Sequence, residues 1–230
     1  MNWAKHFLAF WGWYLCAGPL LRLLREPREL AVAYHTIGET RSKYAHINIS
    51  LEAFKSHINY LKKRGYSFHA FSEAAKSSAG KRAYIYFDDG FRTVYESALP
   101  YLREEQIRAT LFVTTEYIDD KSADEYLRWE DIKKMTDIFE IRSHGAHHVK
   151  LNKIGIDEAE REMRTSKETI ERNLGISVGA FSYPKGRSSD ELEALAHRVG
   201  YEITTADKRF NKVRPDPKDS SSVFKWKILL

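Results

Sequence analysis

Residues 83–90 (AYIYFDDG) are the most informative segment, because an apolar run of strand length leads directly into two carboxylates and a glycine. Five apolar residues without alternation indicate a strand buried on both faces, as in a parallel sheet covered by helices. Asp-Gly between apolar runs also favours a hairpin turn. The residues that follow show a helical pattern through Val94, Ala98 and Leu102, so the segment predicts a strand–loop–helix unit.

The same alternation of strand and helix patterns continues on both sides of this unit. Further strands are predicted at residues 30–34, 109–113, 138–141, 178–182 and 201–205. Helices are predicted from the Ser50 cap to Gly65, over residues 129–135, from Asp157 to Gly175, and from the Ser189 cap to Gly200. The chain is therefore predicted to be an α/β protein, either a small barrel or a doubly wound sheet. Both folds bind ligands at the carboxyl ends of their strands.

Composition excludes several classes of protein. With 43% hydrophobic and 30% charged residues in 230, the chain can bury a sizeable core, which argues against disorder. One cysteine, Cys16, excludes an internal disulfide framework. The net charge of +5 is compatible with an anionic partner such as a membrane or an acidic glycan. No nucleic-acid motif is present, so no nucleic-acid partner is expected.

The two ends of the chain differ from its body. Residues 7–24 (FLAFWGWYLCAGPLLRLL) are almost wholly apolar and are flanked by basic residues. They fit a membrane-surface anchor, a helix packed on its own domain, or a signal peptide. The predicted organisation is an N-terminal apolar or amphipathic helix at 1–29 and a main domain at 30–207. Residues 208–230 are predicted to be a polar loop with a final strand at 224–230.

Side chains and segments that could bind a metal, transfer a proton or bind a substrate follow four of the predicted strands. His35 follows LAVAY, Asp88 and Asp89 follow AYIYF, a histidine cluster follows the strand that ends at residue 141, and YPKG follows VGAFS. Because the carboxyl ends of parallel strands share one edge of a sheet, we expect these groups to lie together.

These groups have the composition of a hydrolytic site. Two neutral imidazoles and one carboxylate leave open positions on a divalent metal, and Asp89, His144 and His148 supply that set. The adjacent His147 is an alternative to His148. Zinc is the expected ion, and Co²⁺, Ni²⁺ and Fe²⁺ accept the same ligands.

Asp88 is left to act as general base, and His35 can protonate the leaving group. Backbone N–H groups near Lys185 can stabilise an oxyanion. The set predicts hydrolysis of an amide or ester.

Three motifs, YFDDG (86–90), SHGAHHVKL (143–151) and FSYPKG (181–186), resemble those of NodB-type polysaccharide deacetylases, carbohydrate esterase family 4. AVAYHTI (31–37), ISLEAFKSHINYLKKRGY (49–66) and YLRWEDIKKM (126–135) are similar to the subgroup that deacetylates poly-N-acetylglucosamine. The resemblance covers residues 30–205. It implies a distorted (β/α) barrel that removes N-acetyl groups from amino sugars of a cell-envelope or exported polysaccharide in a metal-dependent reaction.

The resemblance also implies residue roles. Asp88 is the base, His35 is the acid, and the metal ligands are Asp89, His144 and His148. Substrate and oxyanion contacts come from Tyr183, Pro184 and Lys185. Location in the cell envelope is expected, as a secreted protein or one attached to the membrane surface through residues 1–29.

Three departures from the family pattern leave a second hypothesis open. Gly145 stands where the family has Ser or Thr, and Lys185 stands where an aromatic residue is common. No Leu-x-His motif occurs near the C-terminus, so acid catalysis depends on His35 alone. The alternative is a catalytically impaired glycan-binding protein on the same scaffold.

Overall fold

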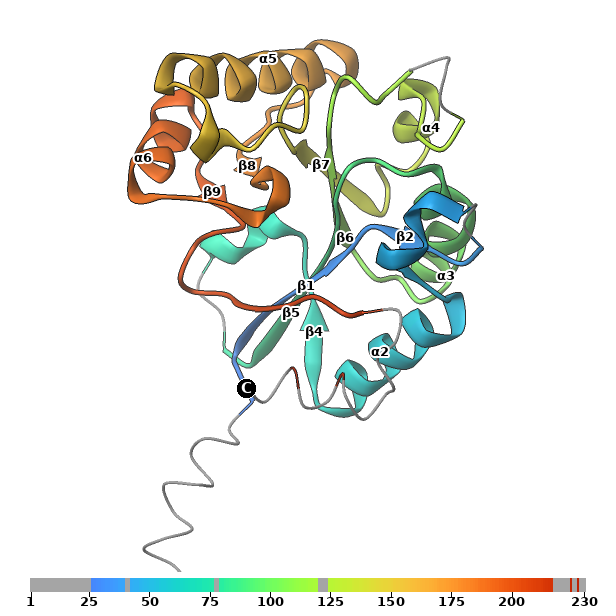
Figure 1. The fold of residues 1–230 in the computed structure, drawn as a ribbon. Helices are drawn as coiled ribbons and strands as arrows, with labels where there is room; N and C mark the ends of the chain where they lie inside the picture. The colour runs from blue at the N-terminus through green and yellow to red at the C-terminus, as the bar shows by residue number, and fades with distance from the viewer. Residues whose placement is uncertain are drawn as a thin grey trace, which may run out of the picture.

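Figure 1 shows a computed structural model that describes residues 26–39, 42–76, 79–119 and 124–216, together with Phe224 and Lys227. Its centre is a curled sheet of parallel strands in the order β10-β1-β5-β6-β7-β8-β9. The additional strand β4 pairs with the first half of β5, whereas β6 pairs with its second half. The strands are β1 (Glu29–Tyr34), β4 (Tyr66–Phe68), β5 (Lys81–Phe87), β6 (Ala109–Val113), β7 (Phe139–Ser143), β8 (Ala180–Phe181), β9 (Ile203–Thr204) and β10 (Asn211–Val213). Within the described ranges the edge strands β9 and β10 are not paired with each other, so the barrel is distorted and open.

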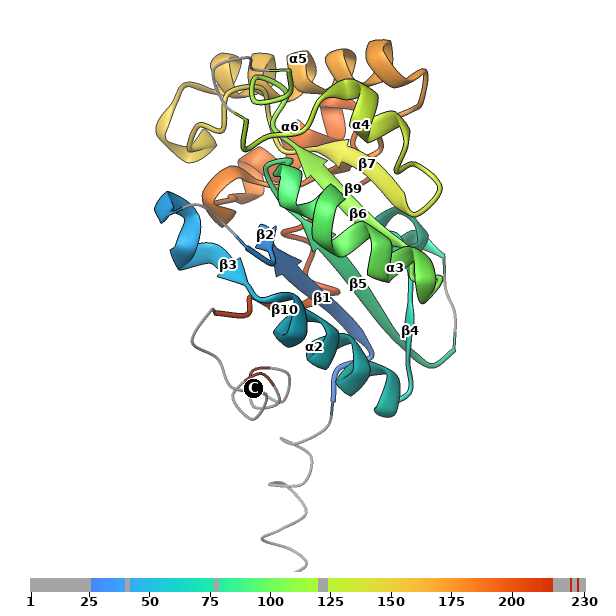
Figure 2. The same ribbon diagram turned by 90° about the vertical axis from the view of Figure 1, so that its right-hand side faces the viewer.

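Helices cover the convex side of this sheet, as the two views in Figures 1 and 2 show. The α-helices are α2 (Leu51–Lys63), α3 (Leu99–Glu104), α4 (Trp129–Lys133), α5 (Ile156–Leu174) and α6 (Asp190–Val199). Short 3-10 helices span Ser42–Ile47, Phe71–Ala75, Leu151–Lys153 and Pro184–Gly186, a π-helical turn at Val94–Ala98 leads into α3, and β2 (Thr36–Ile37) pairs with β3 (Asn48–Ile49). None of the helices in the described ranges has the length and hydropathy of a membrane-spanning segment.

Alternation along each strand separates an outer face from an inner face. In β5, Ala83, Ile85 and Phe87 belong to the large core beneath the helices, whereas Tyr84 and Tyr86 belong to a smaller cluster on the inner face. Because the side-chain period is two, the next inward position after Tyr86 is residue 88. The same count places residue 35 after β1 and residue 144 after β7 on the inner face.

Aromatic side chains fill the inner face at the amino ends of the strands. Phe71 lies at the centre, and its ring centroid is 4.7 Å from that of Phe210, 5.4 Å from Phe112, 5.5 Å from Tyr86 and 5.8 Å from Tyr84. Mixed edge-on and tilted contacts of this kind are the favoured geometry for aromatic rings. This end of the barrel is therefore a packed core.

Most of the predicted elements are confirmed, including their caps. The Ser50 hydroxyl accepts from Ala53 N, the Ser189 hydroxyl accepts from Leu192 N, and α5 ends at Gly175 with a left-handed φ of 66°. The Asp-Gly hairpin is not formed, because β5 continues into the turn at Val94–Ala98 and α3. The predicted strand at 178–182 is shorter, with only Ala180–Phe181 in the ladder.

One prediction at the C-terminal end is wrong. Residues 208–222 are not all loop, because β10 adds to the sheet edge beside β1. The predicted strand at 224–230 lies outside the described residues except for Phe224 and Lys227, which are helical, and the Phe224 ring stacks on His57 with ring centroids 3.9 Å apart. The predicted N-terminal helix lies outside the described residues except for 26–29, where β1 already begins at Glu29.

Candidate functional site

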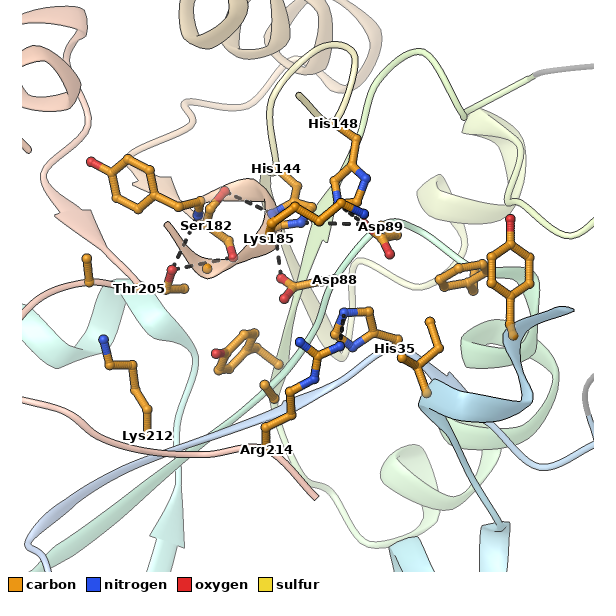
Figure 3. A pocket seen from close by; sticks show the side chains of 18 of the residues that line it. His35, Asp88, Asp89, His144, His148, Ser182, Lys185, Thr205, Lys212 and Arg214 are labelled. Carbon is orange, nitrogen blue, oxygen red and sulfur yellow. Dashed lines mark hydrogen bonds and ion pairs between the residues drawn. The ribbon is translucent and has the colours of Figure 1, made fainter. Parts of the chain in front are cut away.

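The groups that follow the strands converge on one cleft of about 690 Å³ at the carboxyl ends of the inner face. Backbone hydrogen bonds that extend the sheet by one residue hold each group in place. These bonds join Asp88 N to Tyr34 O (3.0 Å), His144 N to Val113 O (2.9 Å) and Ser182 N to Ser143 O (2.9 Å). Figure 3 shows His35, Asp88, Asp89, His144 and His148 together in this cleft.

Asp89, His144 and His148 form a compact set of ligand atoms that lie within 4.8 Å of one another. Asp89 Oδ1 is 3.1 Å from His148 Nε2 and 3.4 Å from His144 Nε2. The oxygen is buried and accepts no hydrogen bond among the described residues. A buried oxygen that accepts no hydrogen bond and faces two ring nitrogens fits a divalent cation.

The neighbours of His144 prepare it for the same role. Its Nδ1 donates to the carbonyl oxygen of Ser182 at 2.9 Å, which leaves the lone pair on Nε2 directed at Asp89. Burial lowers the pKa of His144, and burial with the charge of His144 lowers that of His148 to about 3. Both rings are therefore neutral at physiological pH, the state in which imidazole binds a metal.

The structure distinguishes between the two adjacent histidines. His147 Nδ1 pairs with Glu162 Oε1 at 2.5 Å, and its side chain is 53% exposed, against 11% for His148. The other oxygen of Glu162 accepts from Ala146 N at 3.2 Å and His147 N at 2.9 Å. Glu162 on α5 thereby holds the loop so that His147 faces outward and His148 faces Asp89.

Backbone strain is concentrated in this cleft. Asp89, His148 and Lys185 have positive φ values of 74°, 56° and 60°. Such conformations are costly for residues with a side chain and persist where surrounding contacts fix them. Gly90 has a φ of 93°, and a Cβ on it would lie 2.8 Å from Ile118 Cδ1, so the turn after β5 requires glycine.

The two adjacent carboxyl groups have unusual pKa values. Burial raises the pKa of Asp88 to about 7, although the Ser182 hydroxyl and Arg214 oppose the rise. Burial also raises the pKa of Asp89 to about 6, while the charge on His144 opposes it. Asp88 Oδ1 accepts no hydrogen bond among the described residues and lies 3.8 Å from His144 Nδ1. It is thus available to accept a proton near neutral pH.

His35 has a partner that the sequence did not indicate. Arg214 Nη2 lies 3.2 Å from His35 Nε2. A guanidinium has only donors, so Nε2 accepts and the ring proton resides on Nδ1. Burial and the charge of Arg214 hold the pKa of His35 well below its ordinary value. Protonation of Nε2 therefore requires Arg214 to move away from the ring.

The YPKG segment lies on the other side of Asp88 and Asp89. Tyr183 and Lys185 line the cleft, but Pro184 does not. Tyr183 N is 3.4 Å from Thr205 Oγ1, a long contact that a better acceptor could replace. Tyr183 OH donates to Leu192 O at 3.1 Å, which holds this ring against α6.

Aromatic side chains form a wall of the cleft next to His148. Tyr117 stacks on Tyr126 with ring centroids 4.5 Å apart, and Tyr126 stacks on Phe91 at 5.0 Å. Tyr44 packs edge-on against Phe91 at 4.7 Å. All four rings line the cleft, whereas Trp129 is 9% exposed and belongs to the outer core. Phe91 and Tyr126 are buried, whereas Tyr44 and Tyr117 are half-buried, and it is these two partly exposed rings that can stack on sugars.

Several residues that line the cleft, and Glu162, which supports its histidine loop, escaped sequence reasoning. Lys212 and Arg214 belong to β10 or follow it, and that strand was predicted as loop. Glu162 lies in a helix among other charged residues and has no local signal. Ser182 and Thr205, by contrast, directly follow β8 and β9, so the rule that found Asp88 would have identified them too.

Fold and donor set together define the class, a (β/α)-barrel protein with a candidate divalent-metal site at the carboxyl ends of its strands. Residues 75–204 match the polysaccharide deacetylase family. The chain therefore belongs to the polysaccharide deacetylase family.

Related sequences and structures agree with this assignment. A poly-beta-1,6-N-acetyl-D-glucosamine N-deacetylase of Staphylococcus aureus is 24% identical over 205 residues, which cover 76% of this chain and 71% of that protein. A Bacillus subtilis protein named YxkH is 28% identical over 77% of this chain, and the match spans 64% of the length of YxkH.

The fold matches solved structures over most of the chain. The Streptococcus pyogenes deacetylase PplD has a TM-score of 0.77 at 22% identity, covering 89% of this chain and 99% of that one. IcaB from Ammonifex degensii has a TM-score of 0.75 at 19% identity, with the same coverage. The predicted distorted (β/α) barrel is confirmed.

Proposed function

We propose that this protein is a metal-dependent hydrolase that removes N-acetyl groups from amino sugars of a cell-envelope or exported polysaccharide. The observation that carries the proposal is the cleft in which Asp89, His144 and His148 converge beside the unpaired oxygen of Asp88. Family membership and the N-deacetylases among its relatives support this reaction over other hydrolyses.

The three ligands would hold one divalent ion, and zinc is the proposed ion from the His₂Asp donor set. When bound, such an ion polarises the acetamide carbonyl and lowers the pKa of water. Asp89 is the negative ligand, and its raised pKa in the metal-free site reflects a charge that is buried without its counter-ion.

Asp88 is the proposed general base. Its Oδ1 is buried, faces the cleft and accepts no hydrogen bond among the described residues, so it can take a proton from the attacking water. A base with a pKa near the working pH combines the correct ionisation state with an adequate driving force. Burial raises the pKa of Asp88, and a divalent ion on the adjacent ligand set would lower it again, so Asp88 would be ionised and able to accept the proton.

His35 is the proposed acid toward the leaving nitrogen. It is 9% exposed and lines the cleft on the side opposite the YPKG segment. Arg214 must leave Nε2 before this nitrogen can take up and deliver a proton. When water adds to the carbonyl carbon, the carbonyl oxygen becomes an oxyanion, which can accept from Tyr183 N or from the backbone N–H of Lys185, as the family resemblance implies.

Acetate release from a β-1,6-linked N-acetylglucosamine oligomer tests the proposal. The zinc-loaded chain should release acetate, and Asp88→Asn should lower kcat about 10²- to 10⁴-fold while zinc stays bound. Asp157→Asn, which changes an exposed carboxyl group at the start of α5, is the matched control and should have little effect.

Near wild-type turnover in Asp88→Asn would contradict the role of Asp88. Binding of the oligomer without acetate release under any metal would favour the alternative, a catalytically impaired glycan-binding protein.

The same chain is proposed to associate with a membrane surface through residues 1–29 or to be secreted. Fractionation of cells that express the tagged full-length protein distinguishes these locations.

A further inference from the structure

Three basic side chains line the cleft: Lys212 and Arg214 lie on one side of Asp88, and Lys185 lies on the opposite side. Lys185 comes from the YPKG segment after β8, Lys212 comes from β10, and Arg214 follows β10. Figure 3 shows Lys212 and Arg214 below Asp88, with Lys185 above it. The aromatic wall described above lies next to His148. The cleft is thus aromatic on one side of the ligand set, and Lys212 and Arg214 make another side of it basic.

These cations differ from others at the ends of the sheet. At the amino end of β5, Lys81 pairs with Glu26 at 2.6 Å and Arg82 pairs with Glu29 at 2.9 Å. Among the described residues, no carboxylate pairs with Lys185, Lys212 or Arg214, and the guanidinium of Arg214 contacts only the ring of His35.

The charge balance of the cleft leaves this basic side uncompensated. Among the residues that the structure describes, Asp88 and Asp89 are the only acidic ones that line it. A divalent ion on the ligand set neutralises both of them, since the histidine ligands are neutral. The three basic side chains then give the cleft a net positive charge, and a concave surface concentrates that field.

We propose that Lys212 and Arg214, two residues apart at the end of β10, form a subsite for a carboxylate or phosphate on the sugar unit next to the N-acetyl group, and that Lys185 adds to the positive field from the opposite side of Asp88. The inference rests on the proposed function and specifies its substrate class, an acidic N-acetylated glycan. Lysine and arginine both bind such anions, and the planar guanidinium of Arg214 can pair with two oxygens at once.

The subsite is linked to His35. An anion that pairs with the guanidinium of Arg214 competes with His35 Nε2, its present contact. Occupation of the subsite therefore frees the nitrogen that the acid step requires. An anionic substituent at this position contributes to positioning the substrate and to releasing His35.

Calorimetric binding to the zinc-loaded, full-length Asp88→Asn protein tests the subsite without turnover. The probes are a hyaluronan tetrasaccharide, which alternates N-acetylglucosamine with glucuronic acid, and the neutral chitotetraose. We expect the acidic probe to bind about tenfold more tightly at low salt, and the difference to shrink as salt screens the charges. Comparing the affinity for N-acetylglucosamine 1-phosphate with that for N-acetylglucosamine shows whether the subsite binds phosphate as well as carboxylate.

A matched pair of lysine variants separates a specific subsite from the overall positive charge. Lys212→Gln should reduce the preference for the acidic probe about threefold or more, and Lys212→Arg should retain it. Lys133→Gln changes the net charge equally, but Lys133 is exposed on α4 and does not line the cleft. Equal affinity for both probes, or equal effects of the two Gln variants, would overturn the inference.

Acetate release from chitotetraose by the wild-type protein tests the proposed function separately. Acetate release from this neutral oligomer, with no preference for the acidic probe, would contradict the subsite but support the deacetylase function. A preference for the acidic probe that Lys212→Gln abolishes, without acetate release from any probe, would support the subsite but contradict the deacetylase function.

Discussion

The two ends of the barrel's inner face share the same strands and have opposite character. At the amino ends, Phe71 packs within 5.8 Å of four other aromatic rings. At the carboxyl ends, the same strands lead into a cleft with two buried carboxylate oxygens that accept no hydrogen bond among the described residues. One end therefore stabilises the fold, and the other carries the buried charges of the proposed metal and substrate site.

The amino-end cluster should be the more sensitive to loss of side-chain volume. Phe112 is fully buried and packs edge-on against Phe71 at 5.4 Å. Phe112→Ala should lower the free energy of unfolding by about 3–5 kcal/mol, because it leaves a cavity that the barrel cannot close. Urea denaturation of the metal-free protein measures the change. A loss below about 1 kcal/mol would show that this end is not a packed core.

Removal of a charge from the carboxyl-end cleft should raise the free energy of unfolding, whereas loss of side-chain volume at the amino end lowers it. The folded pKa of Asp88, about 7, lies above its ordinary value of 3.8, so the folded protein binds the extra proton. The stability due to this group is present below pH 4 and is lost as pH rises through about 7. Asp88→Asn should therefore stabilise the metal-free protein at pH 8 by up to about 4 kcal/mol.

Urea denaturation at pH 4.5 and pH 8 checks the sign of this effect. The difference in unfolding free energy between Asp88→Asn and wild type should be large at pH 8 and small at pH 4.5. His144 and His148 have lowered pKa values and act in the reverse sense in both proteins, so the difference cancels their contribution. Destabilisation by Asp88→Asn at pH 8 would contradict the account of this end.

A smaller effect is expected at the residue that orients the histidine loop. Glu162→Ala removes the acceptor of the Ala146 and His147 backbone N–H groups and the partner of the His147 ring. Metal affinity should fall about 10- to 100-fold, as for other residues that support metal ligands. Glu162→Gln keeps an acceptor for the two N–H groups and should recover most of the affinity. Competition with a chromogenic zinc chelator measures both variants, and unchanged affinity in Glu162→Ala would rule out this positioning role.

The sequence predicted the long apolar strands and the groups that follow them, because both signals are local. It missed β10, since Asn211-Lys212-Val213 is a polar edge strand whose pairing with β1 depends on the tertiary fold. Arg214 and Lys212 were therefore missed as lining residues of the cleft.

The choice between His147 and His148 was equally beyond the sequence. It depends on the left-handed backbone of His148, with a φ of 56°, and on Glu162, which lies in a helix that begins several residues later. Neither feature has a signature in the residues next to the two histidines. The strand-end rule locates a site, while its exact ligand set depends on side chains from elements distant in the chain.

The metal content of purified protein after zinc loading and dialysis tests the central claim most directly. The account predicts about one ion per chain in wild type and in His147→Ala, and less than about a tenth of that in Asp89→Ala and His148→Ala. Circular dichroism of each variant confirms that the fold is retained. A wild-type protein that holds no zinc, or a His148→Ala protein that keeps its ion while His147→Ala loses it, would contradict the account.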